Sequence, residues 1–348
     1  MRITYVTEDT ELWGGIAVVF QHLEVLAEAG HDVFLTTPAG KPDWYPLKVP
    51  LQTIKILDAS LIPPADIIVA TSWRTIKPVV ESTRGVAVHL CQGYEGAYKE
   101  FSHFKAAIDE VYSYKIPKLT VSPHLNTLLM ERFAAETFYI GQILNKDIFH
   151  PSRNPYRNNR LNPFKVFKGK ALKVLVVGPF HVDFKNISTA LRGVSLARER
   201  YEIPIKVIRA SQFPLTQDEQ KIIKPVEYHF HVPYSAMGDL YRSADIFIST
   251  SRDAEGFGLP ALEAMACGVP TILSKISSYS SFDGPQDYAL FVEPSDHVAV
   301  AEAINEIFHN RQLQEKLIRR GSEVAGKYSR EEVTERLIAA FKRIKDRL

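Results

Sequence analysis

The fold is decided by the sequence IFISTSRDAEGFGLPALEAMACGVP, residues 246–270. It begins with a short apolar run, 246–250, which is typical of a buried strand in a parallel sheet. A polar loop with glycines at 256 and 258 follows, and Pro260 stands where a helix through residue 267 would begin. This order predicts a strand–loop–helix unit of a doubly wound α/β domain. The loop would lie at the carboxyl end of the strand, where open parallel sheets bind ligands.

The residues of this loop suit a ligand that contains a phosphate and a polyol. Gly256 and Gly258 let the backbone come close to a ligand and adopt dihedral angles closed to other residues. The N–H groups at the start of the following helix favour an anion such as a diphosphate. Glu255 and Glu263 could both accept hydrogen bonds from hydroxyl groups of that ligand. The alternative is structural: Glu263 would complement the helix dipole, and Glu255 would be a solvated loop residue.

Strands and helices also alternate on both sides of this unit. An apolar run at 3–7 leads through a Gly-Gly pair into a helix expected at 16–29, and a second run at 173–177 precedes a helix expected at 187–200. Such alternation predicts parallel sheets that are covered on both faces. The length of 348 residues favours two domains. We therefore expect four parts: a first domain at 1–150, a linker at 151–171, a second domain at 172–329 and a final helix at 330–348.

Composition and charge exclude several classes of protein. The net charge of +2 is too small for a nucleic-acid-binding protein. No apolar run is long enough to span a membrane, and the N-terminus lacks the pattern of a secretory signal. The loop after the first strand also lacks the Gly-x-Gly-x-x-Gly pattern of a dinucleotide oxidoreductase. Cys91 and Cys267 lie in apolar surroundings, which favours buried free thiols. These features predict a cytoplasmic protein and leave its oligomeric state open.

Positive charge is concentrated in the expected linker. Residues 151–171 hold six basic residues and no acidic one, whereas residues 1–150 hold 13 basic and 17 acidic residues. The linker cations could contact a polyphosphate acceptor or anionic lipid, as a peripheral contact with the inner face of the membrane. The alternative is a solvated hinge. The cations are Arg153, Arg157, Arg160, Lys165, Lys168 and Lys170.

Residues 255–270 resemble the signature of the family-four retaining glycosyltransferases, the glycosyl transferases group 1. Other segments resemble recurring segments of the same family, in the expected order along nearly the whole chain. They are Gly14-Gly15 with the helix after it, and residues 30–33, 120–123, 147–151, 240–245 and 289–294. The resemblance implies the GT-B fold, in which two doubly wound Rossmann-like domains face each other across a cleft. It also implies that the last helix crosses back to the first domain.

The resemblance assigns roles to residues of the second domain. Glu263 would bind the ribose hydroxyls of a nucleotide, and Glu255 would bind hydroxyls of the transferred sugar. Lys185 would neutralise the diphosphate, close to Gly178 at the end of the first strand. Backbone amides of the glycine loop would cradle the sugar and the diphosphate. The loop residues in this role are Gly256, Phe257, Gly258 and Leu259.

One position departs from the family pattern. Relatives commonly carry an arginine directly after the glycine that ends the first strand of the second domain, and this chain has Pro179 there. A second cation for the diphosphate is therefore missing from its usual place. Arg209 or His181 could substitute for it.

The first domain contains less distinct candidates. Gly14 and Gly15 would bring the N-terminal helix close to the donor phosphate and the acceptor. In many relatives a histidine ends the strand that corresponds to 86–90. Here His89 lies within that strand, so Gln92 could occupy the corresponding place, and a hydrogen-bonded core position is the alternative for His89. The catalytic candidates are thus Glu255, Lys185, Gln92 and His89.

The resemblance implies a metal-independent, retaining transferase of the hexosyltransferase type. His229 and His231 alternate on one strand, but no third ligand accompanies them, so no metal site is expected. The enzyme would use no cofactor and would move a sugar from a nucleoside-diphosphate sugar, its co-substrate, to a glycan or lipid-linked glycan in cell-envelope polysaccharide biosynthesis. Residues 92–95, Gln-Gly-Tyr-Glu, resemble bacterial rhamnosyltransferases, which suggests a similarity to bacterial rhamnosyl- and mannosyltransferases. The donor base (UDP, GDP or dTDP) stays open, and a nucleotide-sugar epimerase or a non-catalytic sugar-nucleotide-binding relative are the alternatives.

Overall fold

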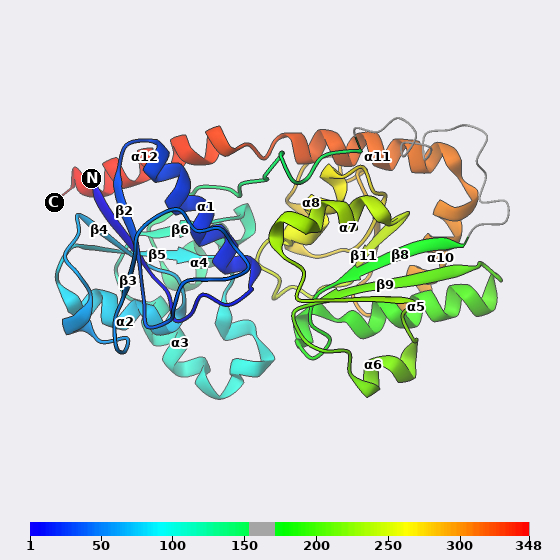
Figure 1. The fold of residues 1–348 in the computed structure, drawn as a ribbon, viewed down its shortest axis with the longest axis horizontal. Coiled ribbons are helices and arrows are strands. Elements are labelled where there is room, and N and C mark those ends of the chain that lie inside the picture. The colour runs from blue at the N-terminus through cyan, green and yellow to red at the C-terminus, as the bar shows by residue number, and fades with distance from the viewer. Residues whose placement is uncertain (153–170, 348) are drawn as a thin grey trace. The chain divides into compact units, whose positions relative to one another are not determined.

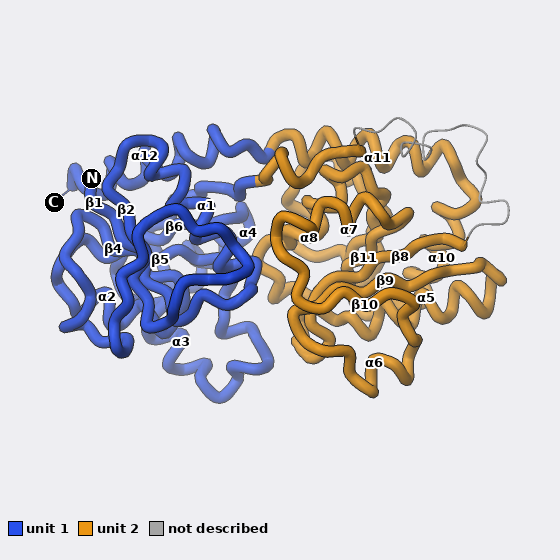
Figure 2. The backbone as a smooth tube through the Cα atoms, viewed as in Figure 1, with its two compact units in different colours: residues 1–143, 328–348 blue, residues 144–327 orange. Residues whose placement is uncertain are grey.

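The computed structural model describes residues 1–152 and 171–347 and divides the chain into two compact units. Unit 1 comprises Met1–Ile143 and Tyr328–Leu348, and unit 2 comprises Leu144–Lys327 (Figure 2). The chain thus enters unit 2 a few residues before the boundary that the composition suggested. The six cations of the expected linker, from Arg153 to Lys170, lie outside the described residues, and so does their expected contact with lipid.

Unit 1 is built on a seven-stranded parallel sheet (Figure 1). The strand order is β3-β2-β1-β4-β5-β6-β7, so the direction of winding reverses between β1 and β4. The strands are β1 (Arg2–Val6), β2 (Asp32–Thr37), β3 (Leu51–Thr53), β4 (Ile67–Ala70), β5 (Val86–Cys91), β6 (Lys118–Thr120) and β7 (Thr137–Tyr139). The helices are α1 (Gly14–Glu28), α2 (Trp73–Ser82), α3 (Lys105–Tyr112), α4 (Pro123–Phe133) and α12 (Arg330–Lys345), with 3-10 turns η1 (Ala59–Leu61), η2 (Glu95–Ala97) and η3 (Lys99–Phe104).

The first strand is buried on both faces, as its apolar sequence predicts. Ile3 and Tyr5 are fully buried. The hydroxyl of Thr4 lies 2.9 Å from that of Thr36 on the neighbouring strand, so this buried polar group has a hydrogen-bond partner. The helix that follows begins at Gly14, slightly earlier than the periodicity indicates. Both glycines of the pair therefore lie in its first turn.

The last helix, α12, packs on unit 1. It contacts α1, and ion pairs tie its two ends to the same unit, from Arg330 to Glu28 at 2.6 Å and from Lys345 to Asp66 at 2.9 Å. Such exposed pairs contribute little to stability. The buried apolar stripe along the helix, repeating every third or fourth residue, is therefore the main source of its attachment.

Unit 2 contains a six-stranded parallel sheet in the order β10-β9-β8-β11-β12-β13. The strands are β8 (Leu172–Val177), β9 (Ile205–Ser211), β10 (Glu227–Phe230), β11 (Ile246–Ser249), β12 (Thr271–Ser274) and β13 (Leu290–Val292). The helices are α5 (Ile187–Arg200), α6 (Gln217–Ile222), α7 (Met237–Ser243), α8 (Leu259–Ala266), α9 (Ser277–Ser280), α10 (His297–His309) and α11 (Arg311–Gly326), with η4 (Asp183–Lys185) and η5 (Tyr234–Ala236). The winding reverses between β8 and β11, and ligands of doubly wound sheets bind at such a switch point.

The core of unit 2 joins the sheet to α5 and α10. Val174 of β8 and Ile248 of β11 are fully buried in one cluster with Val194 of α5. The two helices touch closely at Gly193, because a Cβ atom there would lie 2.4 Å from Cγ1 of Val300. Two doubly wound units, each with a parallel sheet, confirm the fold class expected from the alternation of strands and helices.

Both cysteines, Cys91 and Cys267, are buried and free, which confirms the expected thiols. Among residues 1–152 and 171–347, no helix is long and apolar enough to cross a membrane. Within the same ranges, no group of three or more His, Cys, Asp or Glu side chains is placed to hold a metal ion.

Candidate functional site

The loops that follow β8 and β11 are joined to each other at the switch point of unit 2. β8 ends at Val177, and Gly178 then adopts a φ of +124°. Asn186, between η4 and α5, donates from Nδ2 to the carbonyl oxygen of Thr250 at 3.0 Å. The hydroxyl of Thr250 donates back to the carbonyl oxygen of Asn186 at 2.8 Å. This reciprocal pair fixes the loop after β8 against the loop after β11.

Lys185 and Glu255 form an ion pair where these loops meet. Nζ of Lys185 lies 2.7 Å from Oε2 of Glu255, and the hydroxyl of Ser251 donates to the same oxygen at 2.9 Å. Glu255 is only 7% exposed, so it is not a solvated loop residue. The stem of Lys185 lies over Gly178, since a Cβ atom there would be 3.8 Å from Cδ of the lysine. The structure therefore brings together Gly178, Lys185 and Glu255.

Gly258 is required by both the backbone and the packing. It precedes α8 with a φ of +94°, which other residues rarely adopt. A Cβ atom at this position would lie 2.1 Å from Cε1 of Tyr279. The hydroxyl of Tyr279 is itself fixed by the hydroxyls of Ser249 at 2.5 Å and Ser251 at 3.1 Å. The glycine thus lets the start of α8 lie against a tyrosine that is held by the end of β11.

Glu263 is a buried carboxyl one turn into α8. It is 8% exposed, and the hydroxyl of Tyr241 on α7 donates to its Oε2 at 2.7 Å. Burial raises the pKa of Glu263 to about 7, and the Tyr241 hydrogen bond partly opposes that rise. Because its pKa is raised, this carboxyl is ionised less readily than a solvated one, which weakens its interaction with the helix dipole. A ligand that brings additional hydrogen-bond donors to this carboxyl would favour its ionised form.

Arg209 does not fill the place of the missing cation. It is fully buried, and its Nε lies 2.5 Å from Oε1 of Glu219. Its Nη1 and Nη2 donate to the carbonyl oxygens of Val176 at 2.5 Å and Gly178 at 2.8 Å. The expectation that Arg209 contacts a diphosphate is therefore wrong, because its guanidinium is used inside the unit. Arg209 instead holds the carbonyl of the Gly178 turn.

Two of the expected residues of unit 1 meet at the carboxyl end of its sheet. Nε2 of Gln92, just after β5, donates to the carbonyl oxygen of Gly15 at 3.0 Å. A Cβ atom at Gly15 would lie 3.4 Å from the amide of Gln92, which is a tight contact. A Cβ atom at Gly14 would meet nothing within 4 Å. Gly15 thus packs against Gln92, whereas Gly14 faces open space.

His89 is a core residue rather than a site residue. It is 1% exposed within β5, and its ring packs edge-on against Tyr112 with 5.0 Å between the centroids. Burial lowers the pKa of His89 well below the ordinary range, and the nearby charge of Lys118 lowers it further. The proposed catalytic role for His89 is therefore not supported, because no substrate could reach the ring without the unit opening.

A buried carboxyl in unit 1 was missed by the sequence analysis. Glu95, three residues after Gln92, accepts a hydrogen bond from the backbone N–H of Trp73 at 3.1 Å and another from the hydroxyl of Tyr112. Burial is the main cause that raises the pKa of Glu95 to about 7. The only signal was an acidic residue shortly after the end of a strand, and loops contain many of those.

Comparisons with known proteins find similar sequences for part of the chain. The family model "Glycosyl transferases group 1" matches residues 163–324. The O-antigen chain mannosyltransferase B of Escherichia coli is 35% identical over 117 residues, which cover 34% of this chain and 30% of that protein. The phosphatidyl-myo-inositol mannosyltransferase of Mycobacterium leprae is 21% identical over 173 residues, 49% of this chain and 46% of that protein. The matched stretches thus span less than half of each relative.

The fold itself is shared over almost the whole chain. The crystal structure of HepE from Anabaena in complex with UDP-glucose superposes with a TM-score of 0.79 at 12% identity, covering 98% of this chain and 99% of that one. An identity this low shows the fold and nothing finer. The comparisons confirm the fold that the resemblance of residues 255–270 implies: the chain has the GT-B fold. Residues 163–324, somewhat less than half of the chain, match the model of the glycosyl transferases group 1 family.

Proposed function

We propose that the protein is a retaining glycosyltransferase that moves a sugar from a nucleoside-diphosphate sugar to a hydroxyl group of a glycan or lipid-linked glycan. The observation that carries this proposal is the Lys185–Glu255 pair at the switch point of unit 2, next to Gly258 and the start of α8. A cation and a helix N-terminus suit a diphosphate, and a carboxylate suits the hydroxyls of a sugar. The names of the mannosyltransferase relatives support the same reaction class.

The two carboxyl groups and the glycine loop of unit 2 have distinct roles in this proposal. Glu263 accepts hydrogen bonds from the ribose hydroxyls, and Glu255 accepts them from the sugar. The start of α8 presents backbone amides to the phosphates, and positive φ at Gly258 sets the direction of that turn. The loop residues proposed to contact sugar and diphosphate through their backbone are Gly256, Phe257, Gly258 and Leu259.

The demanding step is the departure of the diphosphate. Cleavage of the bond between the anomeric carbon and the phosphate oxygen leaves negative charge on the diphosphate. Lys185 and the first amides of α8 lie where they can stabilise that charge without rearranging. The ammonium group of Lys185 has three N–H donors, so it can keep its bond to Glu255 while donating to phosphate oxygens. With these groups in place we expect turnover without an added metal ion.

The roles expected for the residues of unit 1 stay predictions. Gln92 uses its amide N–H on Gly15, and its amide oxygen can accept a hydrogen bond from a hydroxyl of a ligand bound to unit 1. Gly14 leaves open space at the start of α1, where a phosphate or an acceptor can approach the helix closely. The retaining outcome is inferred from the resemblance to the family and not from the placement of these side chains.

The biological setting is proposed from the relatives. One of them is named as an O-antigen chain enzyme of Escherichia coli, which supports a role in cell-envelope polysaccharide biosynthesis. UDP, GDP and dTDP are all candidates for the nucleotide. A cytoplasmic location with a peripheral contact at the inner face of the membrane stays a prediction.

The proposal is tested by measuring nucleotide release from UDP-, GDP- and dTDP-sugars, with and without an extract that contains acceptor glycans. We expect release from at least one donor to rise when acceptor is present and to fall about 100-fold in Glu255→Gln. Glu302→Gln removes an exposed carboxylate on α10 and serves as the matched control. Conversion of the donor to an isomer without acceptor would favour the epimerase. Binding without release in every condition would favour a non-catalytic protein.

A further inference from the structure

The cations near the carboxyl ends of β8, β9 and β11 are already paired with carboxylates. Each of the three that the structure places there has a carboxylate oxygen within 2.7 Å. The pairs are Lys185 with Glu255, Arg209 with Glu219, and Arg252 with Asp183. A diphosphate that carries two negative charges would therefore approach an edge whose positive charge is compensated. A further hydrogen-bond donor in this region would add directly to the affinity for the anion.

His181 is such a donor. It lies in the loop between β8 and η4, and its side chain is exposed. Within the described parts of the chain, its imidazole forms no hydrogen bond or ion pair. Its partner is the ring of Phe213, which follows β9 and meets it edge-on, with 4.4 Å between the centroids and 82° between the planes.

The ring that supports His181 is itself fixed. The backbone N–H of Phe213 donates to the hydroxyl of Ser211 at 3.0 Å, and its carbonyl oxygen accepts from the hydroxyl of Tyr228 at 2.5 Å. The backbone of Phe213 is therefore tied to Ser211 at the end of β9 and to Tyr228 in β10. An edge-on contact with a fixed ring orients the imidazole while leaving its ring nitrogens available.

His181 and Lys185 share one short loop above Gly178. The loop starts at the Gly178 turn, whose carbonyl is held by Nη2 of Arg209 at 2.8 Å. It ends at Lys185, whose stem returns over the same glycine. Both residues thus come from the end of β8, at the switch point. His231 also follows a strand end, but β10 is the edge strand and β9 separates it from β8.

We propose that His181 is a further donor-binding residue, which donates an imidazole N–H to a phosphate oxygen of the nucleoside-diphosphate sugar beside Lys185. This inference rests on the proposed function, and it names the diphosphate as the part of the donor that is recognised. Imidazole carries an N–H donor in either tautomer, so the contact does not depend on protonation. A hydrogen bond to a charged group is worth about tenfold or more in affinity.

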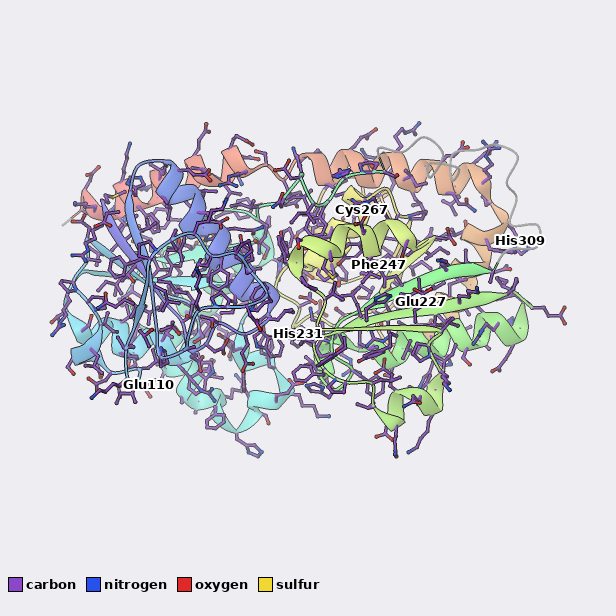
Figure 3. All side chains as sticks on the ribbon, in the orientation of Figure 1. Glu110, Glu227, His231, Phe247, Cys267 and His309 are labelled. Atoms are coloured by element: carbon purple, nitrogen blue, oxygen red, sulfur yellow. The ribbon has the colours of Figure 1, made fainter. Side chains whose placement is uncertain are left out.

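The test compares two ligands with the wild type, His181→Ala and His181→Arg. The ligands are the best-bound nucleoside diphosphate and its parent nucleoside, with affinities measured by calorimetry or by competition. We expect His181→Ala to weaken diphosphate binding about tenfold or more and to leave nucleoside binding unchanged. His181→Arg should restore the affinity for the nucleoside diphosphate. His309→Ala is the control and should change neither affinity. His309 ends α10, and Figure 3 shows it far from His231, which directly follows the carboxyl end of β10.

Two results would overturn this inference and leave the proposed function intact. One is a His181→Ala variant that binds the diphosphate as tightly as the wild type. The other is an equal loss for diphosphate and nucleoside, which would show that the side chain only maintains the loop. If the wild type binds none of the nucleoside diphosphates and releases none from their sugars, the proposed function itself fails.

Discussion

Replacement of Glu263 by glutamine should stabilise the protein at pH 8 and weaken donor binding in the same variant. The carboxyl is 8% exposed, and burial raises its pKa from 4.5 to about 7. A carboxyl with a raised pKa favours the folded state when it is protonated. Its contribution to the free energy of unfolding is therefore full below pH 4.5 and is lost as the pH rises through about 7.

The size of the effect follows from this difference in pKa. A rise of roughly two and a half units corresponds to about 3 kcal/mol. Glutamine carries no ionisable proton, and its amide oxygen can still accept the hydrogen bond from Tyr241. We therefore expect Glu263→Gln to be more stable than the wild type by up to about 3 kcal/mol at pH 8, with the advantage fading toward pH 4.5.

Donor binding should change in the opposite direction. An ionised carboxylate can accept hydrogen bonds from both ribose hydroxyls, whereas the amide of glutamine has one oxygen only. Because the carboxyl must first lose a proton with a pKa of about 7, donor affinity of the wild type should rise about tenfold between pH 6 and pH 8. Glu263→Gln should bind about tenfold more weakly at pH 8 and show no such rise.

Urea denaturation at pH 5 and pH 8 measures the stability arm, and calorimetric titration with a nucleoside-diphosphate sugar measures the binding arm. The intact sugar ester is used because its diphosphate has no group that titrates near pH 7. The reasoning is refuted if the variant is no more stable than the wild type at pH 8. It is also refuted if the donor affinities of the variant and the wild type are equal at pH 6 and at pH 8.

Three further changes test other parts of the structure. Gly258→Ala should lower stability by about 2 kcal/mol or more in urea denaturation, because the methyl group meets Tyr279 at a positive φ; an unchanged midpoint would contradict the packing. Arg209→Met should cost about 3–5 kcal/mol by leaving Glu219 buried and unpaired, and adding Glu219→Leu should recover most of it; equal stability of single and double variants would argue against the pair. Lys185→Met should reduce nucleotide release about 100-fold at temperatures where the variant is still folded, and normal release would remove the lysine from the site.

The sequence predicted the strand, the glycine loop and the helix of the site well, because these three elements are consecutive in the chain. Strand 246–250, the two glycines and the helix near Pro260 are consecutive, so each is specified by its own residues and their immediate neighbours. The helix expected at 187–200 matches α5, and the glycine at position 258 has the positive φ that such loops require.

The interior contacts were not predictable because they join residues far apart in the sequence. Lys185 and Glu255 are 70 positions apart, and nothing in either segment indicates a direct ion pair. Arg209 lies in a strand that is buried on both faces, where a cation is unexpected, and its partner Glu219 is on the next helix. His89 lies inside a strand, so only the packing of Tyr112 on its ring distinguishes core from site.

The most direct test is a crystal structure of the protein with a bound nucleoside diphosphate. The account predicts the diphosphate at the carboxyl ends of β8 and β11, with Nζ of Lys185 in hydrogen-bond contact with a phosphate oxygen. The ribose hydroxyls should contact the carboxyl group of Glu263. A nucleotide bound elsewhere on the protein, with the Lys185–Glu255 pair unchanged and Glu263 contacting only Tyr241, would contradict the central claim.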